Sequence, residues 1–162
     1  MNAIIRRMKI EDLKQVIEID HSSFSLPWPE RSFRFEIAEN PAAHCWVTEQ
    51  DGAVVCFLVF WLIIDEAHIA TLATRADQRR NGLGTALMSH ALKEAASQGA
   101  QSAYLEVRAG NLIAQEMYLK MGFVESDRRS RYYKDNGEDA ILMTLKRLQS
   151  VSEYRLRNGE KP

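Results

Sequence analysis

The chain alternates between segments whose apolar residues recur every third or fourth position and segments in which apolar residues run almost without interruption. The first pattern is typical of helices that bury one face, and the second of strands. Helical spacing predicts four helices, at residues 11–21, 29–40, 83–98 and 112–121. Pro29 suits the first turn of its helix and Pro41 the position after the end, because proline lacks the N–H that a helix interior uses.

Runs rich in valine, isoleucine, phenylalanine and tyrosine lie between these helices. They predict strands at residues 3–7, 44–50, 53–64, 67–74, 102–107, 131–133 and 140–145, with extended structure also at 123–125. Asp51 and Gly52 separate two of the runs and predict a tight hairpin turn. The run at 53–64 is apolar almost throughout, so we expect a central strand that is covered on both faces.

The resulting order, β-α-α-β-β-β-α-β-α-β-β, indicates a mixed α/β fold in which a central sheet carries helices on both faces. The chain has 162 residues, which is typical of one domain. We therefore expect one domain at residues 1–148 and a polar C-terminal tail at 149–162.

Composition narrows the class of protein. The chain has 21 Lys and Arg residues against 22 Asp and Glu, and this balance argues against dedicated nucleic-acid binding. The two cysteines, Cys45 and Cys56, form no disulfide framework, and neither they nor the four histidines have metal-ligand spacing. The longest apolar run has 12 residues, fewer than the roughly 20 of a membrane-spanning helix. We expect a cytoplasmic protein with no metal and no membrane partner.

A glycine-containing loop carries the first candidate chemistry. Residues 79–84 read Arg-Arg-Asn-Gly-Leu-Gly and lie between a predicted strand and a predicted helix. Glycines let the backbone approach a ligand closely, and the first N–H groups of the helix attract an anion. Arg79 and Arg80 add positive charge, so the loop suits a pyrophosphate, although glycines in such a place can also serve only to turn the chain. The P-loop and Rossmann patterns are not present.

Two further motifs make the interpretation specific: Leu-Glu-Val-Arg at 105–108, followed by Asn111, and Met-Tyr-Leu-Lys-Met-Gly-Phe at 117–123. With the glycine loop they resemble the Gcn5-related N-acetyltransferases over residues 4–148. The resemblance is strongest to the bacterial ribosomal-protein-alanine N-acetyltransferases, through Phe-Ser-Leu-Pro-Trp-Pro-Glu at 24–30, Arg-Tyr-Tyr at 131–133 and Gly-Glu-Asp-Ala at 137–140. It implies a mixed, mostly antiparallel sheet with helices on both faces.

The resemblance also implies an activity: an N-acetyltransferase that uses acetyl-CoA as acetyl donor and no metal. The acceptor it implies is the N-terminal α-amino group of a protein, in the first place the N-terminal alanine of a small-subunit ribosomal protein. Main-chain groups of one strand would hold the pantetheine arm and polarise the thioester, and the glycine loop would hold the pyrophosphate. The implied donor-binding residues are Leu72, Ala73, Thr74, Arg79, Arg80, Asn81, Gly82, Leu83, Gly84, Thr85 and Asn111.

Two residues acquire catalytic roles from the resemblance. Glu106 corresponds to the family's proton acceptor, and Tyr118 to the tyrosine that donates a proton to the leaving sulfur. The pattern alone is also compatible with a solvent-facing strand carboxylate at Glu106 and a packing aromatic residue at Tyr118. Asn111 is a plausible helix N-cap as well as a donor contact.

The acceptor is expected to lie among four aromatic residues, namely Trp28, Phe33, Tyr132 and Tyr133. Trp28 and Phe33 are equally compatible with a place in the core, and two consecutive tyrosines in a strand would point to opposite faces. A basic cluster nearby, at Arg128, Arg129, Arg131 and Lys134, reads either as a solvated hairpin or as a patch that attracts ribosomal RNA.

Two other functions stay open at this point. An acetyltransferase for a small amine, such as a polyamine or an aminoglycoside, would use the same fold but is expected to carry extra carboxylates in its pocket. A non-catalytic acetyl-CoA-binding module would keep the glycine loop and lose the acid and the base. Because Glu106 and Tyr118 are both present, we rank the module last.

Overall fold

The computed structural model of the chain describes residues 2–148. These residues form two compact units, and we treat each by itself. Unit 1 contains residues 2–62 and 70–91, and unit 2 contains residues 63–69 and 92–148. The predicted polar tail at 149–162 lies outside the described residues.

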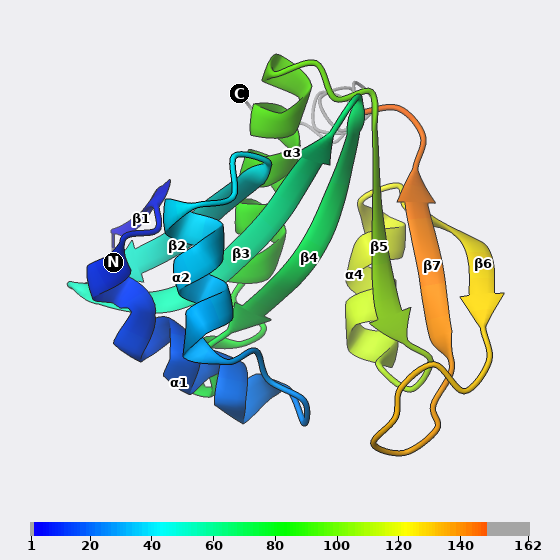
Figure 1. Cartoon of the computed structure of the whole chain (residues 1–162), viewed down its shortest axis with the longest axis horizontal. Coiled ribbons are helices and arrows are strands. Elements are labelled where there is room, and N and C mark those ends of the chain that lie inside the picture. Colours follow the sequence, from blue (N-terminus) through cyan, green and yellow to red (C-terminus); the bar gives the residue numbers. More distant parts are fainter. Residues whose placement is uncertain (1, 149–162) are drawn as a thin grey trace. The chain divides into compact units, whose positions relative to one another are not determined.

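The described residues form seven strands and four α-helices, in the predicted order along the chain (Figure 1). The strands follow one another in the order β1-β2-β3-β4-β5-β7-β6; β4 pairs with β5 in parallel, whereas the pairs β1–β2, β2–β3, β5–β7 and β6–β7 are antiparallel. The bounds are β1 Ala3–Arg7, α1 Leu13–Ser23, α2 Glu30–Ala38, β2 Ala43–Gln50, β3 Ala53–Ile63, β4 Glu66–Thr74, α3 Leu83–Ser97, β5 Ser102–Arg108, α4 Leu112–Lys120, β6 Val124–Arg129 and β7 Ala140–Leu145. Short 3-10 turns lie at Ile10–Asp12 and Ala76–Gln78.

Unit 1 covers both faces of its strands. On one face, side chains of α1 and α2 pack with alternate residues of β2, such as Cys45 and Val47. On the other face Trp46 contacts His90 of α3, with ring centroids 4.4 Å apart. Figure 1 shows α1 and α2 in front of β2 and β3 and the unit-1 part of α3 behind them. Residues 54–60 of β3 are all buried, which confirms the predicted central strand.

A two-residue turn sets the register of the hairpin in unit 1. Asp51 and Gly52 both have positive φ, 51° and 79°, as a tight hairpin turn of this kind requires. The turn pairs Gln50 with Ala53, and the ladder runs on to Ala43 and Trp61. The predicted Asp-Gly hairpin is therefore confirmed.

Unit 2 is built around β5, whose side chains alternate. Ala103, Leu105 and Val107 are buried, whereas Tyr104, Glu106 and Arg108 lie on the opposite, half-buried face. Residues 102–105 pair in parallel with 66–69 of β4, and residues 103–108 pair antiparallel with β7. The half-buried face of β5 thus presents polar side chains from a well-ordered ladder.

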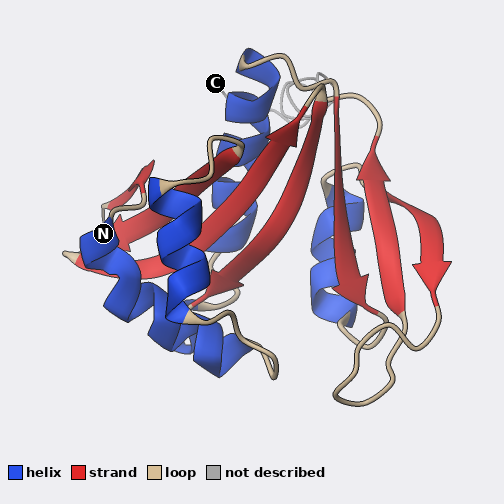
Figure 2. Cartoon of the chain, in the orientation of Figure 1, coloured by secondary structure: helices blue, strands red, loops and turns tan. Residues whose placement is uncertain are grey.

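One predicted strand is wrong. Residues 131–133 form a loop, and the strand that pairs with β7 is the earlier β6, Val124–Arg129 (Figure 2). Arg131 has φ 52°, in the left-handed region, which interrupts an extended strand. The aromatic residues Tyr132 and Tyr133 suggested a strand, but all six residues of β6 are exposed and mostly charged, so β6 carries no hydrophobic alternation.

Two further findings concern membrane-spanning helices and the two cysteines. Within residues 2–148, no helix is long and apolar enough to cross a membrane. Cys45 and Cys56 are buried free thiols. Burial raises the pKa of Cys45 to about 12 and that of Cys56 to about 11, so both are protonated at neutral pH.

Candidate active site

In unit 1 the glycine loop leads directly into α3. Arg80 and Gly82 have positive φ, 64° and 78°, so the chain turns sharply before the helix begins. The first bond of the helix runs from the Ala86 N–H to the Gly82 carbonyl. The N–H groups of residues 83–85 come before that first bond and lie at the N-terminus of the helix, which is the positive end of its dipole. A Cβ on Gly82 would meet no atom within 4 Å, so the loop is open at this point.

The two arginines of the loop differ. Arg79 Nε donates to the Thr74 carbonyl over 3.1 Å, and Arg79 Nη2 donates to Ser23 Oγ, also over 3.1 Å. Arg79 therefore ties the loop to the end of β4 and to the end of α1. Arg80 is exposed beside the start of α3.

The end of β4 leads into the same loop. Leu72 and Thr74 are half-buried and Ala73 is buried. Thr74 Oγ1 lies 3.3 Å from the Cys56 sulfur, and the next N–H, of Arg75, donates to the Val55 carbonyl. These contacts hold the end of β4 against β3 and fix the backbone from which the loop departs.

The loop between α1 and α2 is held from inside unit 1. Asp20 is buried, and its Oδ2 accepts a 2.8 Å hydrogen bond from the Trp28 N–H. Burial raises the pKa of the Asp20 carboxyl, while the hydrogen bond from Trp28 acts in the opposite direction. The Trp28 ring stacks parallel to Trp61, and Phe33 lies 5.2 Å from it. Asp20 was not among the residues that the sequence singled out.

Phe33 requires a correction. Its side chain is 0% exposed and meets Phe57 edge to face, so it lies in the core of unit 1. A fully buried ring does not contact an acceptor, and the expectation of direct contact is therefore wrong. Phe33 instead supports Trp28, which is half-buried.

In unit 2 Glu106 lies within a polar cluster on the half-buried face of β5. Its side chain is 21% exposed, and its Oε1 lies 3.2 Å from Arg129 Nη1. The Tyr132 hydroxyl donates a hydrogen bond to Glu106, which raises the pKa of that hydroxyl. His68 stacks on Tyr104 in the same cluster; burial lowers the pKa of His68, and the charge of Glu106 opposes that effect. The role of Glu106 as proton acceptor stays a prediction.

Tyr118 lies on α4, and Asn111 is the residue directly before that helix. Tyr118 is 8% exposed, and its ring packs against Phe123 with centroids 5.8 Å apart. Asn111 caps the helix, because its Oδ1 accepts a hydrogen bond from the Ala114 N–H over 3.2 Å. The predicted N-cap is therefore confirmed. The donor contact of Asn111 stays a prediction.

Tyr132 and Tyr133 lie side by side in the loop after β6. Their rings meet at 90°, with centroids 5.2 Å apart. Arg129 lies over the ring of Tyr132 and Arg108 over the ring of Tyr133, at 5.6 and 3.9 Å from the centroids. The expected arrangement on opposite faces of a strand does not occur, because the residues are in a loop.

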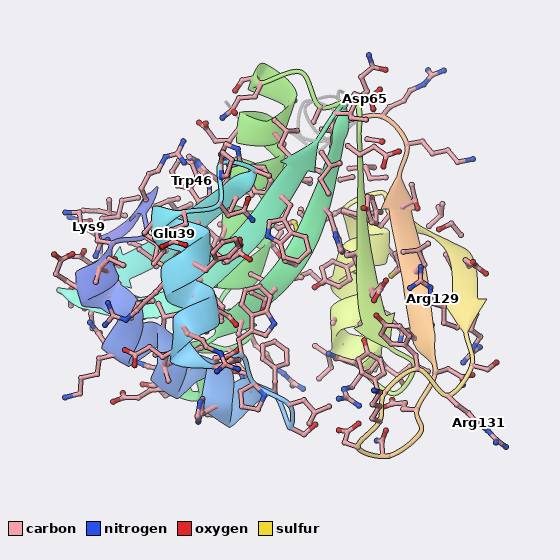
Figure 3. All side chains as sticks on the ribbon, in the orientation of Figure 1. Lys9, Glu39, Trp46, Asp65, Arg129 and Arg131 are labelled. Carbon is pink, nitrogen blue, oxygen red and sulfur yellow. The ribbon has the colours of Figure 1, made fainter. Side chains whose placement is uncertain are left out.

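The arginines of the basic cluster have different partners. Arg129, labelled in Figure 3, pairs with Glu106, and Arg128 Nε pairs with Asp139 Oδ2 at 3.0 Å. Arg131 extends outward from the loop in the same figure and is exposed. The sequence identified these residues only as positively charged. It missed Arg129 and Arg108 as neighbours of the candidate base and of the tyrosines.

Each unit therefore gathers part of the predicted site. Unit 1 contains the glycine loop, residues 72–74 and Trp28, and unit 2 contains Glu106, Tyr132 and Tyr133, together with Tyr118 on α4 and its N-cap Asn111. Residues 2–148 contain no group of three or more His, Cys, Asp or Glu side chains that could hold a metal ion.

Comparison with known proteins identifies the class. Residues 13–123 match the model of the acetyltransferase (GNAT) family. The chain belongs to this family and is an N-acetyltransferase with the mixed α/β fold predicted above.

Individual proteins are similar to this chain over most of its length. The chain is 40% identical over 141 residues to a putative ribosomal protein bS18-alanine N-acetyltransferase of Bacillus subtilis, covering 87% of this chain and 93% of the relative. The crystal structure of the ribosomal-protein-S18-alanine N-acetyltransferase from Escherichia coli matches with TM-score 0.82 and 32% identity, over 89% of this chain and 93% of that one. Arabidopsis thaliana NAA60 in complex with acetyl-CoA shares the fold, with TM-score 0.80, 18% identity and coverage of 89% and 98%.

Proposed function

We propose that this enzyme transfers the acetyl group of acetyl-CoA to the N-terminal alanine of ribosomal protein bS18. The observation that carries the proposal is the likeness, over nearly the whole length, to relatives whose names state this activity. The aromatic residues Tyr132 and Tyr133 of unit 2 suit contact with a peptide segment. The acetyltransferase domain is assigned to residues 1–148, with 149–162 outside it, and the cytoplasm is the compartment in which ribosomal proteins are made.

The donor half of the site is assigned to unit 1. Acetyl-CoA supplies the activated acetyl thioester. The N–H groups at 83–85 and the charge of Arg80 suit its pyrophosphate, together with the open backbone at Gly82. Arg79, which is bonded to Thr74 and Ser23, acts by fixing the loop. The main chain of residues 72–74 is assigned to the pantetheine arm and the thioester oxygen.

The chemistry is assigned to two residues of unit 2. A protonated amine is no nucleophile, so Glu106 removes a proton from the acceptor ammonium group, and the free amine attacks the thioester carbon. Attack leaves the nitrogen with two protons and a positive charge, and it loses one of these protons to water as the tetrahedral intermediate collapses. As the carbon–sulfur bond breaks, Tyr118 donates its hydroxyl proton to the leaving thiolate. The products are the acetylated amine and CoA, and both side chains return to their initial states by proton exchange with water.

The acceptor half is assigned to aromatic residues of both loops. In unit 2 the tyrosines at 132 and 133 offer ring faces to the first residues of a peptide. In unit 1 Trp28, held by Asp20 and backed by Phe33, is a separate aromatic candidate. Arg129 pairs with Glu106 but is 51% exposed, so its side chain is able to leave the carboxylate when an ammonium group arrives.

The decisive experiment uses purified enzyme, acetyl-CoA and a peptide with the N-terminal sequence of bS18 beginning with alanine. Mass spectrometry is expected to find one added acetyl group on the α-amine. A peptide with a blocked α-amine but a free lysine is the matched control and is expected to stay unmodified. In cells, the bS18 alanine terminus is expected to lose its acetyl group when the gene is deleted.

Two outcomes would contradict the proposal. Acetylation of spermidine or an aminoglycoside with no reaction on the alanine peptide would assign the enzyme to small amines. An unchanged bS18 terminus in deleted cells would remove this protein as the responsible enzyme.

A further inference from the structure

Arg108 lies on the same face of β5 as Glu106, two residues further along the strand. Its guanidinium is 24% exposed and reaches the loop at residues 130–139 rather than solvent. Nη1 and Nη2 donate to Oδ1 and Oδ2 of Asp135, both over 3.0 Å, which is the forked geometry of a bidentate pair. Arg108 thus connects the strand of the candidate base to the loop of the two tyrosines.

Further contacts in the loop converge on the same guanidinium. Nη1 also lies 3.4 Å from the side-chain oxygens of Asn136 and Glu138. The guanidinium carbon lies 3.9 Å above the ring centre of Tyr133, a cation–π contact. The loop closes on itself around it, because the Tyr133 N–H donates to the Glu138 carbonyl and the Gly137 N–H donates to the Tyr133 carbonyl.

The same group of residues reaches the turn before α4. Glu138 Oε2 accepts a 2.5 Å hydrogen bond from the Gly110 N–H, next to Asn111. Gln115 Nε2 donates to the carbonyls of Arg108 and Ala109. We call Arg108 and its three loop partners, Asp135, Glu138 and Tyr133, the Arg108 clamp.

We propose that Arg108 is a positioning residue for acceptor binding: the Arg108 clamp holds Tyr132 and Tyr133 in place beside Glu106. The inference rests on the proposed function, since it takes the two tyrosines as acceptor contacts. A loop of ten residues would otherwise sample many conformations, and ordering it on binding would weaken acceptor affinity. Lysine keeps the charge at this position but not the fork or the stacking surface, so it is unable to replace arginine.

The test compares Arg108→Lys with Arg128→Lys in the full chain. Arg128 makes a single hydrogen bond with the carboxylate of Asp139, which a lysine can also make, so it is the matched control. We expect Arg108→Lys to raise KM for the alanine peptide about tenfold, while kcat changes less than about threefold and the affinity for acetyl-CoA stays as in wild type. Arg128→Lys is expected to match wild type in all three.

A second measurement needs no acceptor and separates this inference from the proposed function. Hydrogen exchange of the amides at 131–138 is expected to speed up in Arg108→Lys and to stay slow in Arg128→Lys. Unchanged exchange in Arg108→Lys would overturn the clamp whatever the enzyme acetylates. A different outcome would contradict only the proposed acceptor: exchange is faster in Arg108→Lys, but the wild-type enzyme does not acetylate the alanine peptide.

A third variant covers the case in which Arg108→Lys does not fold. Glu138→Gln keeps the Arg108–Asp135 pair but weakens the bonds to Arg108 and to the Gly110 N–H. We expect a smaller rise in peptide KM, about threefold, with kcat retained. A fall in kcat, in peptide affinity and in acetyl-CoA affinity by the same factor would show general damage and overturn a positioning role.

Discussion

Glu106 and Arg129 form an ion pair across unit 2, with Oε1 and Nη1 3.2 Å apart, although β7 lies between their strands. Both residues pair with β7, which lies between β5 and β6: Glu106 is opposite Leu142, and Arg129 is opposite Ala140, two residues away along β7. The pair is diagonal, and the arginine is half in solvent. A candidate base that is held in this way is ordered before any acceptor arrives.

Glu106→Gln keeps the shape of this side chain and removes its ability to accept a proton. We expect turnover to fall by about 10²–10⁴, the usual contribution of a positioned base, with acetyl-CoA affinity unchanged. The residual rate should rise with pH, because more of the acceptor amine is then unprotonated. Wild-type turnover at pH 7 in steady-state kinetics would show that Glu106 is an ordinary strand residue.

Tyr118→Phe removes only a hydroxyl. Because the ring packs on Phe123 and is almost fully buried, phenylalanine preserves the packing. If the hydroxyl protonates the leaving thiolate, kcat on the alanine peptide should fall about tenfold or more, with acetyl-CoA affinity nearly constant. A thermal melt checks that the fold is intact. Equal kcat in the two proteins would return Tyr118 to a packing role.

Gly82→Val tests the donor loop. Valine at φ 78° is strained and places a side chain where the pyrophosphate is expected. Gly52→Val is a matched control, because Gly52 has φ 79° and similarly open surroundings in the β2–β3 turn. Calorimetry should show a large loss of acetyl-CoA affinity in Gly82→Val alone. Equal affinities in two folded variants would contradict the assignment of the loop.

Asp20→Asn tests the anchor of the α1–α2 loop through its pH dependence. The folded-state pKa of Asp20 is raised, so its contribution to stability is fully present below the unfolded pKa, about 3.9, and is lost as pH rises through the folded value. Asparagine removes the buried charge, and its amide oxygen can still accept from the Trp28 N–H. We expect the variant to be more stable than wild type at pH 7.

Urea denaturation at pH 7 and at pH 4 measures this difference, which should shrink at the lower pH. Asp77→Asn is the control of opposite sign, because the hydrogen bond from Arg75 lowers the pKa of Asp77. Asp77 is exposed, so its effect should be small. A variant Asp20→Asn that is less stable than wild type at pH 7 would show that the ionised carboxylate is needed there.

Much of the fold followed from local pattern. The apolar run at 53–64 and the Asp51–Gly52 turn identified the central hairpin, since continuous burial and positive φ each leave a clear signal. Strand β6 left none: its register comes from pairing with β7, and its own side chains are solvated.

Some residues of the candidate site could likewise be found from local sequence, and others could not. Short motifs pointed to Glu106, Tyr118 and the glycine loop, whereas Asp20 and Arg108 act through partners that are 8 and 27 positions away. Helical spacing also put Phe33 on an apolar face but did not decide between the core and an acceptor groove. Contacts of this kind depend on the tertiary fold and have no local signature.

Strand β6 lies at the open end of the strand order, and its outer backbone groups have no neighbouring strand among residues 2–148. Such an edge is a template on which another chain could add a strand and begin to aggregate. Its residues include Glu125, Asp127, Arg128 and Arg129, and the register shifts between Glu125 and Asp127. Charge and irregularity together make the edge a poor template, so the strand that carries a partner of the candidate base also protects the protein's solubility.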